Sequence, residues 1–506
     1  MRRKMLTLLI AVIMLVIITF VLKRRDSSLS NLRGPAPSSY ILGHEYELTQ
    51  QSDVGKLEFA WLEKYGPTMR VFGCFSEEVL MIADPMGLQH ILQSQNYPKT
   101  KDIRLIAERV FGRGLLWATG NAHHRLRRAL NPAFSTQQLK HFVPLFQETT
   151  TQLVERWKEE LKGGSMIFNM AEWIPKITLD VIGRSAFDFK FGVLDGTSKY
   201  NELYCAIRDM FLDSKSPSTV TVIYSALRRR LPESLSFKLF TTKEDRRLSA
   251  FLTTAQATAK VILVQKLEAQ TPGPNNEGDK DILSVLVRAL SFDDARRRLT
   301  QDEIISQMAT ILLAGHETSS GSMSWMLYEL SKHPESQTTL YEEIAALRAR
   351  IGYDTPLKPE HYDSMPFLNA VIKESLRLNP ILPMLVREAS CDDTIPLSIP
   401  VKTNSGSVLS HIPITKGQRI LLPFSVYNRL SQVWGEDANS WNPRRVMELQ
   451  AMLFGIIESF EFGLPFEDLD VQRIPSILMV PMIRGQPELG VQLPLKVTQR
   501  RGSSSA

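Results

Sequence analysis

The sequence predicts a mainly α fold (α+β) with small β-sheets behind an N-terminal transmembrane helix, and three observations support this. A chain of 506 residues with 43% hydrophobic content can bury a large core. Most of the chain has apolar residues at helical spacing. Short strand-like segments occur at Thr68–Phe72, Val79–Ala83 and Arg419–Leu422, and one long uncharged segment lies near the N-terminus.

The uncharged segment, Met5–Leu22, reads MLTLLIAVIMLVIITFVL. As a helix it is about 27 Å long, which is enough to cross a thin bilayer such as the endoplasmic reticulum. A cleaved secretory signal is the alternative, but its apolar core is usually shorter and a small-residue cleavage site follows, whereas KRRDSS follows here. We therefore expect residues 1–25 to be a single-pass membrane anchor with basic flanks, and the body to lie in the cytosol.

The net charge of +6 does not indicate a nucleic-acid partner. Six basic residues flank the anchor before the first acidic residue, Asp26, so the other 54 basic residues balance the 54 acidic ones. The three cysteines, Cys74, Cys205 and Cys391, are too few and too scattered for a disulfide framework or a four-ligand zinc site. This scarcity fits a reducing, cytosol-facing location.

The rest of the chain is expected to form one large, mostly helical domain. Residues 26–39 contain Pro35 and Pro37, and they should form a semi-rigid hinge because proline fixes φ. Residues 40–498 contain no repeat, and residues 269–281 are the clearest loop within them. Residues 499–506 form a polar tail.

The longest predicted helix begins after Thr300, which lies three residues before Glu303 in a capping-box arrangement. In its middle, AGHETSSG combines glycines with hydroxyl side chains that can bond back to backbone carbonyls, so we expect the helix to open or bend there. The acid–alcohol pair Glu317–Thr318 could then hold a small ligand and relay protons to it.

Two alternatives remain open for this segment. Thr318 could cap a second helix at a simple helix break. His316 could be a hydrogen-bonded core or surface histidine, which is the commoner case for a lone histidine.

Further charged residues lie on separate elements. In KESLRLNP, Glu374 and Arg377 occupy positions i and i+3 of a helical face, where such pairs are usually solvated surface bridges. His123 and Arg127 lie one helical turn apart, and Arg387 lies in an extended stretch. Arginines on different elements could converge on carboxylates, although ordinary surface charge is the alternative.

Taken in order, the motifs resemble the haem-thiolate monooxygenases of the cytochrome P450 family, in its microsomal, fungal-type branch. They are HHRLRRALNPAF, AGHETSS, ESLRLNP, VREAS, KGQRI, WGEDANSWNPRR and MELQAMLFGIIESFEF, and RGPAPSSYILGHE resembles the family's hinge. The resemblance covers nearly the whole chain. It implies a cytochrome P450-like fold, haem (iron protoporphyrin IX) as cofactor, and NADPH–cytochrome P450 reductase as electron donor.

The resemblance also implies roles for particular residues. Thr318 would lie beside bound dioxygen, with Glu317 as its acidic neighbour in proton delivery. The residues that would bind haem, the first three through its propionates, are His123, Arg127, Arg387 and Ala314. The residues that would form a structural triad are Glu374, Arg377 and Arg445.

One element of the family is missing. In the family, a meander and a glycine-rich loop, F-x-x-G-x-R-x-C-x-G, follow the segment around Arg445 and present the cysteine that ligates iron. Here Val446 and Met447 follow directly. The apolar residues that then predict a helix are Leu449, Met452, Leu453, Ile456, Ile457 and Phe460. No cysteine follows Cys391, so no metal ligand is assigned and thiolate ligation is not expected in this chain.

Two hypotheses follow. The first is a monooxygenase of secondary metabolism or detoxification that acts on a lipophilic small molecule, of which this chain is an inactive or impaired version produced by a lost exon or a misassigned splice. The second is a membrane-tethered pseudoenzyme that binds a hydrophobic ligand or a partner. The segments that correspond to substrate-contacting regions, residues 101–120 and 211–237, are apolar enough for a hydrophobic substrate.

Overall fold

The structure, a computed structural model, describes residues 28–194, 201–212, 217–230, 242–269, 281–292, 298–443, 451–476 and 478–500. The expected anchor, loop 270–280, the junction at 444–450 and most of the polar tail lie outside these residues. The chain divides into two compact units. Unit 1 comprises Met1–Leu105, Lys215–Thr242 and Leu382–Ala438, and unit 2 comprises Ile106–Ser214, Lys243–Ile381 and Asn439–Ala506.

Unit 1 contains a four-stranded sheet in the order β1–β2–β7–β4, in which β2 and β7 are parallel. The strands are β1 (Thr68–Phe72), β2 (Glu78–Ile82), β7 (Arg419–Leu422) and β4 (Leu385–Glu388). All three predicted strands are confirmed, β2 with a shift of one residue. Successive side chains point to opposite faces, so Val79 and Met81 pack into one apolar cluster and Leu80 and Ile82 into another.

The other elements of unit 1 are mostly short. A two-stranded sheet pairs β5 (Asp393–Lys402) with β6 (Val408–Ile414). The helices are α2 (Glu45–Gln50), α3 (Lys56–Tyr65), α4 (Pro85–Gln93), the start of α5 (Lys101–Phe111), α11 (Thr219–Arg230), α19 (Phe424–Tyr427) and α20 (Ser431–Trp434). The described part of the hinge also belongs here, because Leu29 and Leu32 are buried in the core of unit 1.

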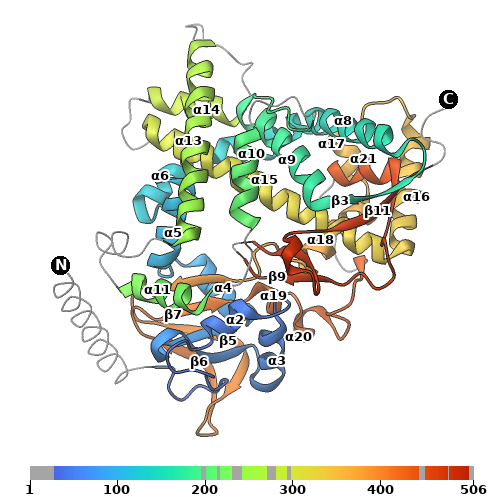
Figure 1. Ribbon diagram of the computed structural model, residues 1–506. Coiled ribbons are helices and arrows are strands. Elements are labelled where there is room, and N and C mark those ends of the chain that lie inside the picture. Colours follow the sequence, from blue (N-terminus) through green and yellow to red (C-terminus); the bar gives the residue numbers. More distant parts are fainter. Residues whose placement is uncertain are drawn as a thin grey trace. The chain divides into compact units, whose positions relative to one another are not determined.

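Unit 2 is mainly helical, and its longest helix is α15 (Gln301–Lys332) (Figure 1). α15 packs against α9 (Met170–Phe187), α13 (Lys243–Ala269) and α18 (Pro366–Leu378). The other α-helices are α6 (Gly120–Leu130), α7 (Thr136–His141), α8 (Val143–Leu161), α10 (Asn201–Leu212), α14 (Ile282–Arg288), α16 (Pro334–Ile351), α17 (Pro359–Asp363) and α21 (Ala451–Ser459). Two small sheets pair β3 (Ser165–Asn169), β11 (Pro494–Gln499) and β8 (Phe460–Gly463), and β9 (Val471–Ile474) with β10 (Val480–Ile483).

The helix predicted after the junction ends earlier than expected. α21 stops at Ser459, and Phe460 begins β8, which pairs with β11. Within the described part of the predicted stripe, Leu453 and Ile457 are buried from the helix, whereas Phe460 is buried from the strand. The strand is set by pairing with the C-terminal β11, which helical spacing alone does not reveal.

None of the helices in the described ranges is both long and apolar enough to cross a bilayer. The expected anchor, Met5–Leu22, is not among these residues, and it therefore stays a prediction.

Candidate functional site

The acid–alcohol pair lies near the middle of α15. The Thr318 hydroxyl donates a hydrogen bond to the carbonyl oxygen of Ala314 at 2.6 Å, one turn earlier in the helix. The neighbouring Glu317 side chain is 18% exposed. The hydroxyl is therefore held in a fixed direction beside a carboxylate that reaches the protein surface.

His316 is a core histidine, as one of the two alternatives proposed. Its side chain is fully buried, and its Nε2 atom is hydrogen-bonded to the carbonyl oxygen of Pro175 on α9 at 3.0 Å. Its Nδ1 atom lies 3.2 Å from Oε1 of Glu317. His316 thus connects the acid–alcohol pair to α9.

α15 runs without interruption through this segment, so the helix does not open there and Thr318 does not cap a second helix. The expected bend stays a prediction. The glycines instead permit close packing. A Cβ atom at Gly315 would lie 2.5 Å from Cδ1 of Ile182 on α9, and one at Gly321 would lie 3.0 Å from Cδ1 of Ile381. The glycines are therefore explained by tertiary contacts, which offset their low helix propensity.

The Glu374–Arg377 pair is buried, so the alternative of a solvated surface bridge is wrong. Arg377 donates from Nε and Nη2 to the two carboxylate oxygens of Glu374, both at 2.7 Å, and the side chains are 2% and 0% exposed. Arg377 also donates to the Ser440 carbonyl at 3.2 Å, and Glu374 accepts the backbone N–H of Asn442 at 2.9 Å. The pair therefore holds the chain that leads to the junction. Arg445, the expected third member, lies outside the described residues.

Trp441 is a further site residue that the motif roles do not predict. Its indole N–H donates to the Ser336 hydroxyl at 3.1 Å, and its ring stacks on His333 with the ring centroids 5.6 Å apart. An aromatic residue within SWNP was the available signal. Trp441 and the buried ion pair together attach this segment to α15, α16 and α18.

The residues expected to bind the propionates are divided between the units. His123 and Arg127 lie on α6 in unit 2, with His123 half-buried and Arg127 exposed. Arg387 lies in β4 of unit 1, which confirms the extended stretch. Their convergence on one ligand stays a prediction.

Arg387 is a half-buried cation that fits an anionic ligand. Its Nη1 atom donates to the carbonyl of Val386 at 3.0 Å, and no carboxylate in the described parts of the chain pairs with it. Burial lowers the pKa of Arg387. Burial, followed by the charges of Arg387 and Arg104, also lowers the pKa of Lys99 to about 8. A propionate would compensate this positive charge.

The residues available to ligate iron do not fit a haem-thiolate centre. Cys391, the last cysteine in the sequence, lies between β4 and β5. Cys74 is fully buried, and burial, followed by the charge of Glu45, raises the pKa of its thiol to about 12. Across the residues that could be searched, no cluster of three or more His, Cys, Asp or Glu side chains could hold a metal ion. Arg387 therefore fits the haem propionates, whereas a ligand for the iron is missing from the sequence where the family has one.

Known proteins are similar along nearly the full length of this chain. The model of the family described as Cytochrome P450 matches residues 34–466. "Cytochrome P450 monooxygenase 128" from Postia placenta is 31% identical, over 94% of this chain and 93% of its own length. "Cytochrome P450 monooxygenase claP" from Ampulloclitocybe clavipes is 31% identical over 92% of each chain. "Cytochrome P450 monooxygenase 205" from Postia placenta is 28% identical, over 95% of this chain and 94% of its own.

Proposed function

Because this chain belongs to the cytochrome P450 family of haem-dependent oxidoreductases, we propose that its lineage inserts one oxygen atom from dioxygen into a lipophilic small molecule. The similar proteins are named monooxygenases, which supports this reaction class. The apolar character of residues 101–120 and 211–237 supports a lipophilic substrate, and secondary metabolism or detoxification is the corresponding role.

The observation that carries the oxygenase proposal is the Thr318 hydrogen bond to Ala314 beside Glu317. The hydrogen of the Thr318 hydroxyl is directed to a backbone carbonyl. The lone pairs of its oxygen therefore remain available to accept a hydrogen bond from a donor. The partly exposed Glu317 carboxylate can exchange protons with solvent. The two side chains together can hold and transfer a proton inside a largely buried helix. Haem, when it is bound through a thiolate, supplies iron that favours O–O cleavage.

For the chain as printed, we propose impaired or absent turnover. No cysteine follows Cys391, and the residues on both sides of the Arg445–Val446 junction resemble regular family sequence. An abrupt junction of this kind favours a lost exon or a misassigned splice. Sequencing the transcript across the junction tests this origin, and recovery of the short junction alone would exclude a misassigned splice.

The second candidate is a membrane-tethered pseudoenzyme that binds a hydrophobic ligand or a partner. The missing thiolate favours the pseudoenzyme. The contacts that the chain retains without any iron ligand favour it as well. The buried Glu374–Arg377 pair still holds Ser440 and Asn442 in place. A scaffold that keeps these contacts can bind ligands without oxidising them.

We further propose that residues 1–25 anchor the protein in the endoplasmic reticulum membrane, with the body facing the cytosol and a flavoprotein reductase as electron donor. The uncharged Met5–Leu22 segment and its basic flanks support the anchor. Carbonate extraction of microsomes, followed by protease digestion of intact vesicles, tests it. Release by carbonate, or protection of the body from protease, would contradict the proposal.

A carbon monoxide difference spectrum of the full chain, reduced and reconstituted with haem, tests the function. The matched control is the same chain with the family's cysteine loop inserted between Arg445 and Met447. We expect a thiolate-type band from the control alone. The same band from the chain without the inserted loop would refute the proposal that its turnover is impaired. Absence of haem binding by both proteins would overturn the oxygenase assignment in favour of the pseudoenzyme.

A further inference from the structure

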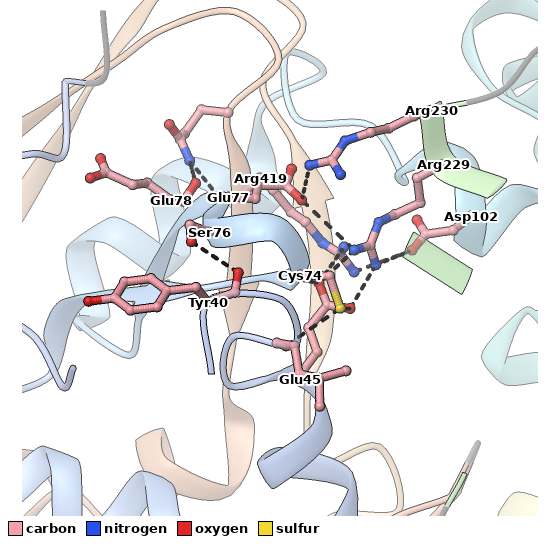
Figure 2. Close-up of polar contacts among 12 residues, drawn as sticks. Tyr40, Glu45, Cys74, Ser76, Glu77, Glu78, Asp102, Arg229, Arg230 and Arg419 are labelled. Carbon is pink, nitrogen blue, oxygen red and sulfur yellow. Dashed lines mark hydrogen bonds and ion pairs between the residues drawn. The ribbon is translucent and has the colours of Figure 1, made fainter. Parts of the chain in front are cut away.

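A cluster of ion pairs in unit 1 connects α11 to three other elements (Figure 2). Arg229 on α11 donates to both carboxylate oxygens of Glu45 on α2, at 2.6 and 3.1 Å, and its Nη1 atom lies 3.5 Å from Oδ2 of Asp102 on α5. Arg419 on β7 lies 3.5 Å from Glu45 and 3.3 Å from Asp102. Two arginines and two carboxylates thus alternate in a closed ring. We name these four residues the α11 latch.

The α11 latch is largely removed from solvent, since its four side chains are only 12–21% exposed. Although burial opposes it, the charges of Arg229 and Arg419 lower the pKa of Glu45. Burial alone would raise the pKa of Asp102 as well, but the charges of Arg419 and Arg229 outweigh it and lower this pKa. Both carboxyl groups are therefore ionised near neutral pH. Removing one of them leaves a partly buried charge without its partner, which is costly.

Apolar residues also hold α11. In the described part of α11, Val222 and Ala226 are the buried residues. They pack on Cys74 of the short 3-10 helix η1 (Cys74–Ser76), together with Leu42, Tyr46 and Phe75. A helix of twelve residues is marginal by itself. The ion pairs of Arg229 therefore add to the docking of α11 in unit 1.

We propose that Arg229 is a positioning residue, and that the α11 latch fixes α11 against the start of α5 to shape the site for a lipophilic substrate. This proposal rests on the proposed function, because that function makes residues 101–120 and 211–237 the segments expected to contact substrate. Asp102 lies on the first segment and Arg229 on the second, so their ion pair connects the two. Opening of the latch releases α11 and uncovers the apolar surface around Cys74.

Cys74 provides a built-in reporter of latch opening. Its side chain is fully buried, with Val222 and Ala226 of α11 packed against it. Burial, followed by the charge of Glu45, raises the pKa of the thiol to about 12, so the reactive thiolate is scarce while the latch is closed. Alkylation of Cys74 therefore requires its cover to open, and Val222 and Ala226 of α11 form part of that cover.

The experiment uses the full chain in lipid nanodiscs, with Cys205→Ser and Cys391→Ser so that Cys74 is the single thiol. Alkylation by N-ethylmaleimide is followed by mass spectrometry in the parent and in Arg229→Met. We expect labelling at least about tenfold faster in Arg229→Met, and faster than any lowering of its Tm accounts for, because local opening becomes more frequent. Arg229→Lys, which keeps the charge, should restore most of the protection.

The matched control is Arg70→Met, which removes the Arg70–Glu78 ion pair of unit 1, at 2.9 Å and with side chains of similar exposure (18% and 21%). Its labelling rate should equal that of the parent. Equal rates in Arg229→Met and the parent would overturn the latch, as would acceleration that only follows a lowered Tm. If Arg229→Met does not fold, Asp102→Asn provides the same comparison.

Binding of a lipophilic dye, anilinonaphthalene sulfonate, tests the link to substrate. Faster dye entry in Arg229→Met than in Arg70→Met supports the positioning role, and equal entry rates contradict it. Neither labelling nor dye binding needs haem or turnover. Failure of the latch is therefore distinguishable from failure of the monooxygenase assignment, which the carbon monoxide spectrum tests.

Discussion

The backbone N–H of Asn442 donates to Oε1 of Glu374 at 2.9 Å, across 68 positions of the sequence. The same carboxylate is held by Arg377, whose guanidinium also reaches the Ser440 carbonyl. Since the chain here leads directly into the junction, its position before the missing loop is set by contacts that do not depend on iron.

Glu374→Ala should destabilise the protein by about 3–5 kcal/mol, because it leaves the buried Arg377 charge uncompensated. The double variant Glu374→Leu/Arg377→Met should be markedly more stable than Glu374→Ala, since the Arg377 charge is removed together with its partner. Urea denaturation followed by circular dichroism measures both. Glu159→Ala is the control, because its partner Arg156 and Glu159 itself are 50% and 70% exposed, and it should cost less than about 1 kcal/mol. A cost this small for Glu374→Ala would contradict the structural role.

Gly315→Ala should destabilise the α15–α9 contact despite its better helix propensity. The propensity gain is about 1 kcal/mol, whereas overpacking against Ile182 costs about 1–3 kcal/mol. Ile182→Val removes the Cδ1 atom that the new methyl group would meet. The double variant should therefore be about 1 kcal/mol more stable than the sum of the single changes predicts. Strict additivity in thermal unfolding would show that the two residues are not in steric conflict.

Thr300→Ala should cost about 1 kcal/mol, because Thr300 caps α15. Its hydroxyl accepts the backbone N–H of Glu303 at 3.2 Å, and the Glu303 carboxylate accepts the backbone N–H of Thr300 at 3.0 Å. Thr339→Ala, in the interior of α16, is the control, since its hydroxyl donates back to the Glu335 carbonyl and does not cap the helix. Denaturant midpoints should separate the two variants. A cost for Thr339→Ala as large as that for Thr300→Ala would indicate a general loss of threonine rather than loss of a cap.

Local patterns predicted the elements whose signals are local. The predicted capping box is confirmed at Thr300 and Glu303, because the two residues that form it are close in sequence. The predicted strands are confirmed at Thr68–Phe72 and Arg419–Leu422, because their sequence pattern extends over only a few residues. The role that the family motifs imply for Thr318 stays a prediction, although its hydroxyl contact lies one turn away in the same helix.

Predictions failed where the partner comes from a distant element. Gly315 was expected to open α15, but Ile182 of α9 explains its lack of a side chain. From its sequence spacing, Glu374 resembles a surface charge, but in the structure it is buried and held by Asn442 and Arg377. Spacing within one segment contains no information about such partners. The α11 latch is the extreme case, since Glu45 and Arg419 are 374 positions apart.

Lys99 should make the stability of the protein depend on pH in the alkaline range. Its pKa in the folded protein is about 8, compared with 10.5 for the ordinary side chain. Between these values the unfolded chain binds more protons, so the free energy of unfolding rises with pH, by at most about 1.4 kcal/mol per pH unit. Below pH 8 the destabilisation by the half-buried Lys99 cation is fully present, and above pH 10.5 it is lost.

Lys99→Met removes this titration, so its stability advantage over the parent should shrink as the pH rises from about 8 to 10.5. Arg387→Met is the matched variant, because it removes a neighbouring charge that lowers the pKa of Lys99. In that background the pKa should return toward its ordinary value, and the pH dependence due to Lys99 should weaken. Denaturant midpoints across this pH range measure all three proteins. A difference between Lys99→Met and the parent that stays constant with pH would show that Lys99 does not titrate there, and that the cationic site around Arg387 is better solvated than the structure indicates.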